Sequence, residues 1–119
     1  MKNYTVKPMS NIAQVGLDEL VGTECNVHEG LESPDGILVR STKLSKEVIN
    51  DNLKAISRAG AGVNNIPVED CTEKGVVVFN TPGANANAVK ELVLAGLMLS
   101  SRNIFQSIDF VNNLSAMKD

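Results

Sequence analysis

The chain of 119 residues has few aromatic side chains, a single histidine and two cysteines. Aromatic residues make up 3% of the sequence and tryptophan is absent, which argues against the stacking platforms that bind single-stranded nucleic acid. The formal net charge is −3 and the isoelectric point is near 5.1, which disfavours nucleic acid or an anionic membrane as the main partner. The composition therefore predicts neither a nucleic-acid-binding protein nor a membrane-surface protein.

Signals for metal binding, secretion and membrane insertion are also missing. Cys25 and Cys71 lie far apart and the chain has one histidine, so no zinc-site spacing is present; we expect His28 to be a surface residue. The N-terminus carries no basic, apolar signal segment, and no apolar run reaches the roughly 20 residues that a membrane-spanning helix needs. We therefore expect a cytoplasmic protein with two free thiols, no metal site and no membrane segment.

Hydrophobic residues make up 43% of the chain, which is enough for one folded domain with a modest core. Short apolar runs predict strands at residues 4–6, 25–27, 36–40, 54–57 and 76–79. Periodicity and capping residues predict helices at residues 12–21, 46–52 and 68–74. The alternation of strands and helices predicts an α/β fold with an open, flavodoxin-like parallel sheet and helices on both faces.

Two of the predicted strands end in an arginine. If these strands are parallel neighbours, Arg40 and Arg58 emerge at the same edge of the sheet, where ligands of open α/β sheets bind. Arg58 is followed by a Gly-Ala-Gly loop, residues 60–62, whose backbone can come close to a ligand and offer N–H groups to it. Together with Ser41, these residues predict a site for one anionic ligand. Two solvated surface arginines are the alternative interpretation, and Lys43 is expected to be a solvated lysine.

The stretch RAGAGVNNIPVEDCTEKGVVVFNTPGANANAVKEL resembles the substrate-domain signature of the D-isomer-specific 2-hydroxyacid dehydrogenases. The upstream segment GILVRSTKLSKEVIN strengthens the resemblance, which is specific over about residues 35–102. Within the family, the branch that acts on phosphoglycerate is the most similar. The family usually has an aspartate at the position of Asn64.

The resemblance assigns roles to the residues at the predicted anion site. It implies that Arg40, Ser41 and Arg58 help to bind a small phosphorylated 2-hydroxy acid. It also implies that the backbone N–H groups of the glycine loop, Gly60 and Gly62 among them, face the carboxylate of that acid. The position of Ala61, between the two glycines, is expected to lie on the nicotinamide side of the cleft that binds NAD.

The sequence contains no Gly-x-Gly-x-x-Gly fingerprint after a strand, so it shows no dinucleotide-binding domain of its own. By resemblance, the catalytic histidine, its carboxylate and an activating arginine are expected beyond Asp119. No catalytic residue is therefore assigned here, and the isolated chain is expected to be inactive.

Two segments follow from this interpretation. We expect residues 1–87 to form a substrate-binding (catalytic) domain segment and residues 88–119 to form a long linking helix toward an absent nucleotide-binding domain. The apolar side chains of that helix are not confined to one stripe. A helix that is apolar nearly all round is expected to be buried, and we predict that it pairs in a homodimer.

The leading hypothesis is the substrate-binding segment of an NAD-dependent enzyme that oxidises 3-phosphoglycerate to 3-phosphohydroxypyruvate in serine biosynthesis. A reductase of glyoxylate, hydroxypyruvate or another 2-keto acid is the first alternative. Arg40 disfavours it, because an unphosphorylated substrate has no second anionic group. A non-catalytic, flavodoxin-like binding module is the second alternative.

Overall fold

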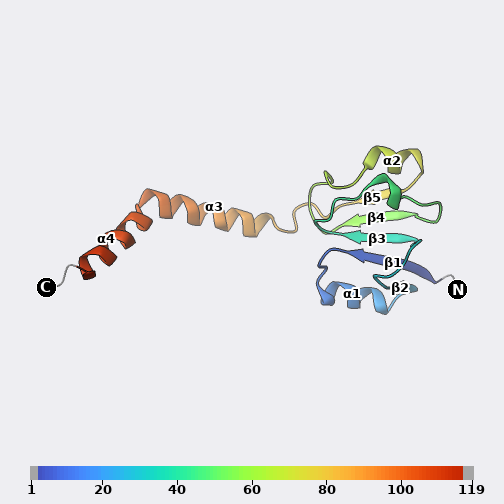
Figure 1. The fold of residues 1–119 in the computed structure, drawn as a ribbon, viewed down its shortest axis with the longest axis horizontal. Helices are drawn as coiled ribbons and strands as arrows, with labels where there is room; N and C mark the ends of the chain where they lie inside the picture. The colour runs from blue at the N-terminus through green and yellow to red at the C-terminus, as the bar shows by residue number, and fades with distance from the viewer. Residues whose placement is uncertain (1–2, 117–119) are drawn as a thin grey trace. The chain divides into compact units, whose positions relative to one another are not determined.

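The computed structural model describes residues 3–116. The chain divides into two compact units, one within Met1–Ala84 and the other within Asn85–Asp119. Within the described residues, the first unit contains all the strands and the second consists of two helices (Figure 1).

The first unit is built around a five-stranded parallel sheet in the order β2-β1-β3-β4-β5. The strands are β1 (Tyr4–Met9), β2 (Cys25–Val27), β3 (Gly36–Val39), β4 (Ala55–Arg58) and β5 (Val77–Phe79). The connections contain helix α1 (Gln14–Val21) between β1 and β2, the 3₁₀ turn η1 (Lys46–Val48) between β3 and β4, and helix α2 (Val68–Glu73) between β4 and β5. The predicted α/β fold with an open parallel sheet is confirmed, and its strand order is the flavodoxin-like one.

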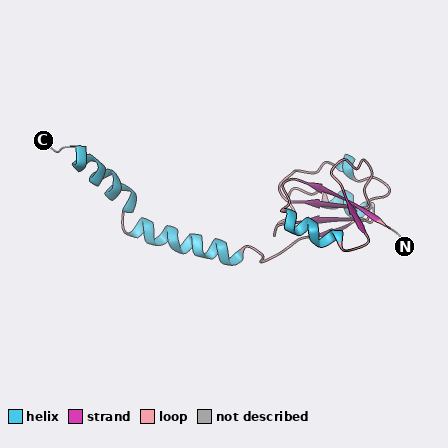
Figure 2. Ribbon diagram, turned by 90° about the horizontal axis from the view of Figure 1, so that it is seen from below, coloured by secondary structure: helices cyan, strands magenta, loops and turns pink. Residues whose placement is uncertain are grey.

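The direction of the strand order reverses between β1 and β3. Because crossover connections between parallel strands are right-handed, this reversal places α1 on one face of the sheet and η1 and α2 on the other. Figure 2 shows α1 in front of the strands in a view from below. The reversal also creates the switch point at which the loops after β1 and β3 diverge, and ligands of such sheets bind there.

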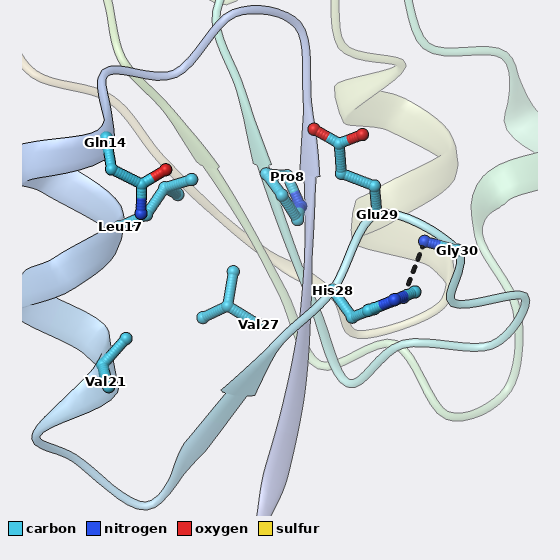
Figure 3. A pocket seen from close by; sticks show the side chains of 8 residues that line it. All are labelled: Pro8, Gln14, Leu17, Val21, Val27, His28, Glu29 and Gly30. Carbon is cyan, nitrogen blue, oxygen red and sulfur yellow. Dashed lines mark hydrogen bonds between the residues drawn. The ribbon is translucent and has the colours of Figure 1, made fainter.

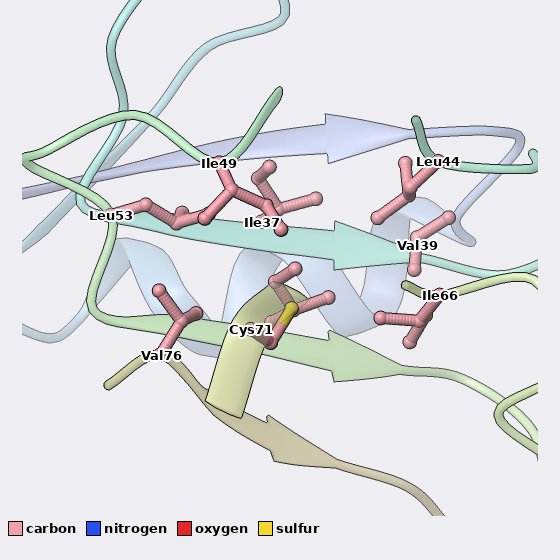
Figure 4. Packing of buried hydrophobic residues seen from close by; sticks show 9 residues of the cluster. Ile37, Val39, Leu44, Ile49, Leu53, Ile66, Cys71 and Val76 are labelled. Carbon is pink, nitrogen blue, oxygen red and sulfur yellow. The ribbon is translucent and has the colours of Figure 1, made fainter. Parts of the chain in front are cut away.

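The core lies on the face that is covered by η1, α2 and their loops. Side chains from β3 and β4 meet side chains from the connecting segments there (Figure 4). The buried cluster consists of Ile37, Val39, Leu44, Ile49, Leu53, Ile56, Ile66, Cys71 and Val76. Burial raises the pKa of the Cys71 thiol, with a smaller contribution from Asp70, so this cysteine is a core residue rather than a reactive one.

Strand β1 is longer than the sequence predicts, because it continues through Pro8 to Met9. The Tyr4 N–H donates to Glu24 O on the β2 side of β1, and backbone groups alternate sides along a strand. The nitrogen of Pro8 therefore also faces the β2 side, but β2 ends at Val27. A proline can stand in this central strand because its missing N–H lies beyond the end of the neighbouring strand.

The helix predicted at residues 46–52 is reduced to the short turn η1. Asn50 Oδ1 accepts hydrogen bonds from the backbone N–H groups of Asn52 (2.8 Å) and Leu53 (3.1 Å). This local turn competes with helical hydrogen bonding, so the helix does not extend past Ile49.

The second unit consists of α3 (Ala86–Ser101) and α4 (Ile104–Ala116), where the sequence predicts one continuous helix. The helices are separated at Asn103, which has φ of 53°, a left-handed conformation that asparagine tolerates better than most residues. No residue of α3 is buried. No helix in the described part of the chain is both long and apolar enough to span a bilayer.

Candidate functional site

Arg40 and Arg58 lie at the same edge of the sheet. Strands β3 and β4 are parallel neighbours in which Val39 pairs with Arg58, and Arg40 follows Val39 directly. The Arg58 guanidinium donates from Nε to Arg40 O (3.1 Å) and from Nη1 to Asn64 Oδ1 (3.1 Å). The structure therefore brings together the two arginines that the sequence predicts at one edge.

The loops at this end of the sheet contain no acidic residue. We call the loops that follow β1, β3, β4 and β5 the cationic rim; it comprises residues 10–12, 40–43, 58–66 and 80–84. The rim contains Arg40, Lys43 and Arg58 and neither aspartate nor glutamate, although the whole chain has a net charge of −3. Because Asn64 is neutral, it does not cancel the charge of Arg58, and the rim suits an anionic ligand.

The glycine loop makes room for the Arg58 guanidinium. Neither Gly60 nor Gly62 has a positive φ. A Cβ atom on Gly60 would lie 3.3 Å from Arg58 Nε, and one on Gly62 would lie 3.1 Å from Arg58 Nη1. The sequence predicts that these glycines let a ligand approach the backbone; the structure adds that they accommodate the arginine.

Sequence analysis predicts that the Gly60 N–H faces a ligand, but this group donates to Arg58 O (2.9 Å) and is occupied. Two other backbone N–H groups of this loop are available to a ligand. Ala61 and Gly62 are exposed, and within the described residues neither backbone N–H donates a hydrogen bond. The segment after β5 binds the carbonyl groups of this loop. Thr81 N donates to Gly60 O (3.0 Å) and Asn80 Nδ2 donates to Ala61 O (2.7 Å). The sequence indicates only a break in the strand at Asn80 and Thr81, and it misses their role as anchors.

Asn65 anchors the other loop of the rim. Its side chain is buried, and its Nδ2 donates to Thr42 O (2.8 Å) and Arg40 O (3.4 Å). The backbone carbonyl of Asn65 accepts a hydrogen bond from Leu44 N (2.8 Å). These bonds fix the backbone that carries Arg40 and Ser41. The sequence offers only an Asn-Asn pair after a glycine, a pattern that cannot separate a buried anchor from a turn residue.

Ser10, the first residue after β1, is a further contact of the rim that sequence analysis misses. Its Oγ accepts hydrogen bonds from Thr42 N (3.0 Å) and Ser41 N (3.3 Å) and lies 2.7 Å from Thr42 Oγ1. Its backbone φ is 83°. The backbone N–H groups of Ser41 and Thr42 are therefore occupied, so a ligand near Ser41 meets its hydroxyl.

A depression with a volume of about 340 Å³ lies beside Arg40. Its wall consists of Asn11, Ile12, Ala13, Val15, Gly16, Arg40 and Ala59. It thus extends the rim toward the beginning of α1 and gives a ligand of Arg40 space on that side.

A larger hollow, with a volume of about 740 Å³, lies elsewhere, between α1 and the end of β2 (Figure 3). Its lining residues are Pro8, Gln14, Leu17, Val21, Val27, His28, Glu29 and Gly30. The exposed His28 accepts a hydrogen bond at Nδ1 from Gly30 N (2.9 Å). With an apolar wall, no arginine or lysine and one glutamate, this hollow does not suit an anion, so we place the candidate site at the cationic rim.

The described residues do not form a dinucleotide cradle. A Rossmann fingerprint needs a glycine turn that leads directly into a helix N-terminus. Here the glycine loop ends at Gly62, and α2, only six residues long, begins at Val68. Ala61 remains the single residue predicted to face NAD.

A parallel sheet in the order β2-β1-β3-β4-β5, with two arginines and no carboxylate in the loops at the carboxyl ends of its strands, defines a flavodoxin-like α/β domain with a cationic rim. The sequence profile described as "D-isomer specific 2-hydroxyacid dehydrogenase, catalytic domain" matches residues 2–117. The chain belongs to this family, as its sequence predicts.

Individual relatives match the chain over part of their length. D-3-phosphoglycerate dehydrogenase of Methanocaldococcus jannaschii is 44% identical over 82 residues, which are 66% of this chain and 16% of that protein. Hydroxypyruvate reductase of Thermotoga maritima is 45% identical over 73 residues, which are 59% of this chain and 24% of that protein. The chain therefore spans less than a quarter of the length of these relatives.

A solved structure with a similar fold contains the cofactor. The NAD⁺-bound 3-phosphoglycerate dehydrogenase of Entamoeba histolytica superimposes with a TM-score of 0.67 and 29% identity. The match covers 82% of this chain and 39% of that one. The family of this chain is therefore a family of oxidoreductases, and at least one relative binds NAD.

Proposed function

We propose that this chain is the substrate-binding segment of an NAD-dependent D-3-phosphoglycerate dehydrogenase that acts in cytoplasmic serine biosynthesis. The observation that carries the proposal is the cationic rim, where Arg40 and Arg58 meet on neighbouring strands without a carboxylate. 3-Phosphoglycerate has a phosphate and a carboxylate, and a rim with two separate guanidiniums suits such a ligand. The similarity to D-3-phosphoglycerate dehydrogenases supports the same substrate.

In this proposal the chain binds and orients the substrate. Arg40, Ser41 and Arg58 hold the anionic groups, and the free N–H groups of Ala61 and Gly62 bind the carboxylate. Another part of the parent enzyme would hold NAD, which would supply the acceptor for the hydride of C2, and a catalytic base there would take the proton of the hydroxyl group. Orientation without a cofactor and a catalytic base gives no turnover, so the chain alone is expected to be inactive.

A reductase of hydroxypyruvate is the second candidate. The identity to the Thermotoga maritima hydroxypyruvate reductase, 45%, is as high as that to the dehydrogenase, 44%. The substrate of the dehydrogenase carries a phosphate group and the substrate of the reductase does not. The two candidate functions therefore differ in the group that Arg40 is expected to bind.

Binding to the 119-residue chain separates the candidates. We would follow ¹H–¹⁵N spectra during titrations with 3-phosphoglycerate and with glycerate, which lacks the phosphate. We expect 3-phosphoglycerate to bind more tightly, and we expect Arg40→Met to weaken it by at least about tenfold, because a charge-assisted contact is lost. Arg102→Met, a matched change in the second unit, should have no effect. Equal affinities for both acids, unchanged by Arg40→Met, would favour the reductase.

We also propose that the second unit pairs with another copy of the chain in a homodimer. Large apolar side chains of α3 and α4 are exposed, among them Leu92 (73%), Met98 (68%) and Phe105 (66%). Apolar surface of this extent is unusual for an isolated monomer and is typical of an interaction surface.

A further inference from the structure

Ser10 adopts an unfavourable backbone conformation at the rim. Residues Met9 and Val39 are paired in β1 and β3, so Ser10 follows β1 where Arg40 follows β3. Its φ of 83° lies in the left-handed region, which glycine and asparagine tolerate better than serine does. A serine here therefore indicates that its hydroxyl has a function that compensates for the strain.

The hydroxyl of Ser10 is fully used in hydrogen bonds. Its oxygen accepts from the backbone N–H groups of Ser41 (3.3 Å) and Thr42 (3.0 Å), which occupy both lone pairs. The remaining O–H can then donate to Thr42 Oγ1, 2.7 Å away. The side chain of Ser10 thus binds the loop after β3 and has no free hydrogen-bonding group for a ligand.

The same loop is held from its other side through its carbonyl groups. Asn65 Nδ2 donates to Thr42 O and Arg40 O, and Arg58 Nε also donates to Arg40 O. Within the described residues, the Arg40 side chain itself is exposed and has no hydrogen bond or ion pair. The position of Arg40 is therefore set by the backbone of its loop. Ser10 binds the N–H groups of Ser41 and Thr42, and Asn65 binds the carbonyl groups of Arg40 and Thr42.

We propose that Ser10 is a positioning residue of the substrate site: its hydroxyl holds the backbone of residues 41–42 so that Arg40 and Ser41 face the anion. This inference rests on the proposed function, since it assumes that Arg40 and Ser41 bind the substrate. Ser10 acts through these residues and does not contact the substrate.

Two substitutions separate the hydroxyl from the backbone strain. Ser10→Gly removes the hydroxyl but favours the left-handed backbone, so the fold should be retained. Ser10→Asn also tolerates this backbone and restores an acceptor oxygen in the side chain, which makes it the rescue variant. Ser45→Gly, at an exposed serine outside the rim, is the matched control.

The first measurement is amide hydrogen exchange in the 119-residue chain without ligand. We expect Ser10→Gly to accelerate exchange at Ser41 and Thr42 by about tenfold, because their acceptor is lost, and Ser10→Asn to restore protection in part. Exchange at Ala59, whose N–H donates to Val39 O, should stay unchanged. Unchanged exchange at Ser41 and Thr42 would overturn the proposal. This result does not depend on any ligand.

The second measurement is the affinity for 3-phosphoglycerate. We expect Ser10→Gly to weaken binding about fivefold, and to have an effect of less than about twofold when Arg40 is already methionine, as for coupled residues in a double-mutant cycle. An equal loss in both backgrounds would mean that Ser10 acts independently of Arg40 and would overturn its positioning role. If the unsubstituted chain does not bind 3-phosphoglycerate, the proposed function fails, and the exchange experiment alone decides whether Ser10 holds the loop.

Discussion

At the scale of single residues, Asn64 determines the charge that the rim presents to a ligand. It is exposed and accepts a hydrogen bond from Arg58 at 3.1 Å, as a carboxylate in the same place would. An asparagine orients the guanidinium without cancelling its charge, whereas an aspartate would form an ion pair with it. The combination of Arg58 with Asn64 therefore keeps the rim more positive than an Arg–Asp pair would.

We predict that Asn64→Asp weakens binding of 3-phosphoglycerate by about threefold to tenfold, because the new carboxylate competes for Arg58 and repels the anion. The free energy of unfolding should change by less than about 1 kcal/mol, since the pair is exposed. Isothermal titration and chemical denaturation measure the two quantities. Asn26→Asp, in the edge strand β2, adds the same charge away from the rim and should leave affinity unchanged. Unaltered affinity in Asn64→Asp would argue against a role for Arg58 in binding.

Asp35 directly precedes β3, at the end of the strands opposite the rim. It should make the stability of the domain depend on pH. The pKa of its carboxyl is lowered from 3.8 to about 2, first by the hydrogen bond from Lys54 and then by those from the backbone N–H and the hydroxyl of Thr5. Because the folded state binds this proton more weakly than the unfolded state, Asp35 stabilises the fold fully above pH 3.8 and loses this effect as the pH falls toward about 2.

We expect Asp35→Asn to lower the free energy of unfolding at pH 7 by on the order of 1 kcal/mol, a value reduced by solvent screening. It should have little effect near pH 2. Urea denaturation across this pH range tests the prediction. The control is Asp51→Asn, because the Asp51 side chain is 99% exposed and lies 3.6 Å from Lys74. A pH-independent effect of Asp35→Asn would contradict the assignment.

The sequence predicts the position of the cations at the rim but not of the residues that hold them. Arg40 and Arg58 are visible because each follows an apolar run, and parallel strands end at a common edge. Ser10 and Asn65 are about thirty and twenty residues from the loop that they hold. Such hydrogen bonds between distant segments have no periodic or local pattern, and so the sequence alone does not reveal them.

At the scale of elements, Asn103 separates α3 from α4. We predict that Asn103→Gly retains the break, because glycine tolerates its φ of 53°, whereas Asn103→Ala favours a continuous helix by about 1 kcal/mol. Carbon chemical shifts of residues 101–105 report the backbone conformation directly. Asn113→Ala, within α4, should leave these shifts unchanged. A break that persists fully in Asn103→Ala would show that another feature ends α3.

The strands were more predictable than the connections between them. Continuous apolar runs mark β3, β4 and β5, as expected for parallel strands, although β5 is not covered on both faces, since Val77 (52%) and Phe79 (55%) are exposed. The lengths of the helices depend on single polar residues. The Asn50 side chain closes a turn where the hydrophobic periodicity predicts a helix. The left-handed backbone of Asn103 separates α3 from α4 within a stretch whose hydrophobic pattern shows no break. Hydrophobic pattern thus predicts the element type, and polar side chains at its ends decide its length.

At the scale of the whole molecule, we predict concentration-dependent self-association through the second unit. Sedimentation velocity should detect a dimer of the 119-residue chain, and Leu92→Lys with Met98→Lys should shift it to monomer, since charged side chains are costly to bury. Val15→Lys, at a residue of α1 that is 71% exposed, is the control. A monomer at every concentration would exclude the proposed pairing.

The architecture of the sheet followed from the sequence, because alternating strands and helices permit few topologies. No local pattern encodes which strand neighbours which, so the sequence predicts the flavodoxin-like class of the sheet without showing each strand pair directly.

Pro8 has a consequence at some distance from the rim. The ladder between β1 and β2 continues as far as the bond from His28 N to Val6 O, and the next bond would require an N–H on residue 8 to reach His28 O. Proline cannot supply it, so the ladder between β1 and β2 ends there. Pro8, Val27 and His28, which stand at this end of the ladder, are lining residues of the hollow of about 740 Å³ beside α1.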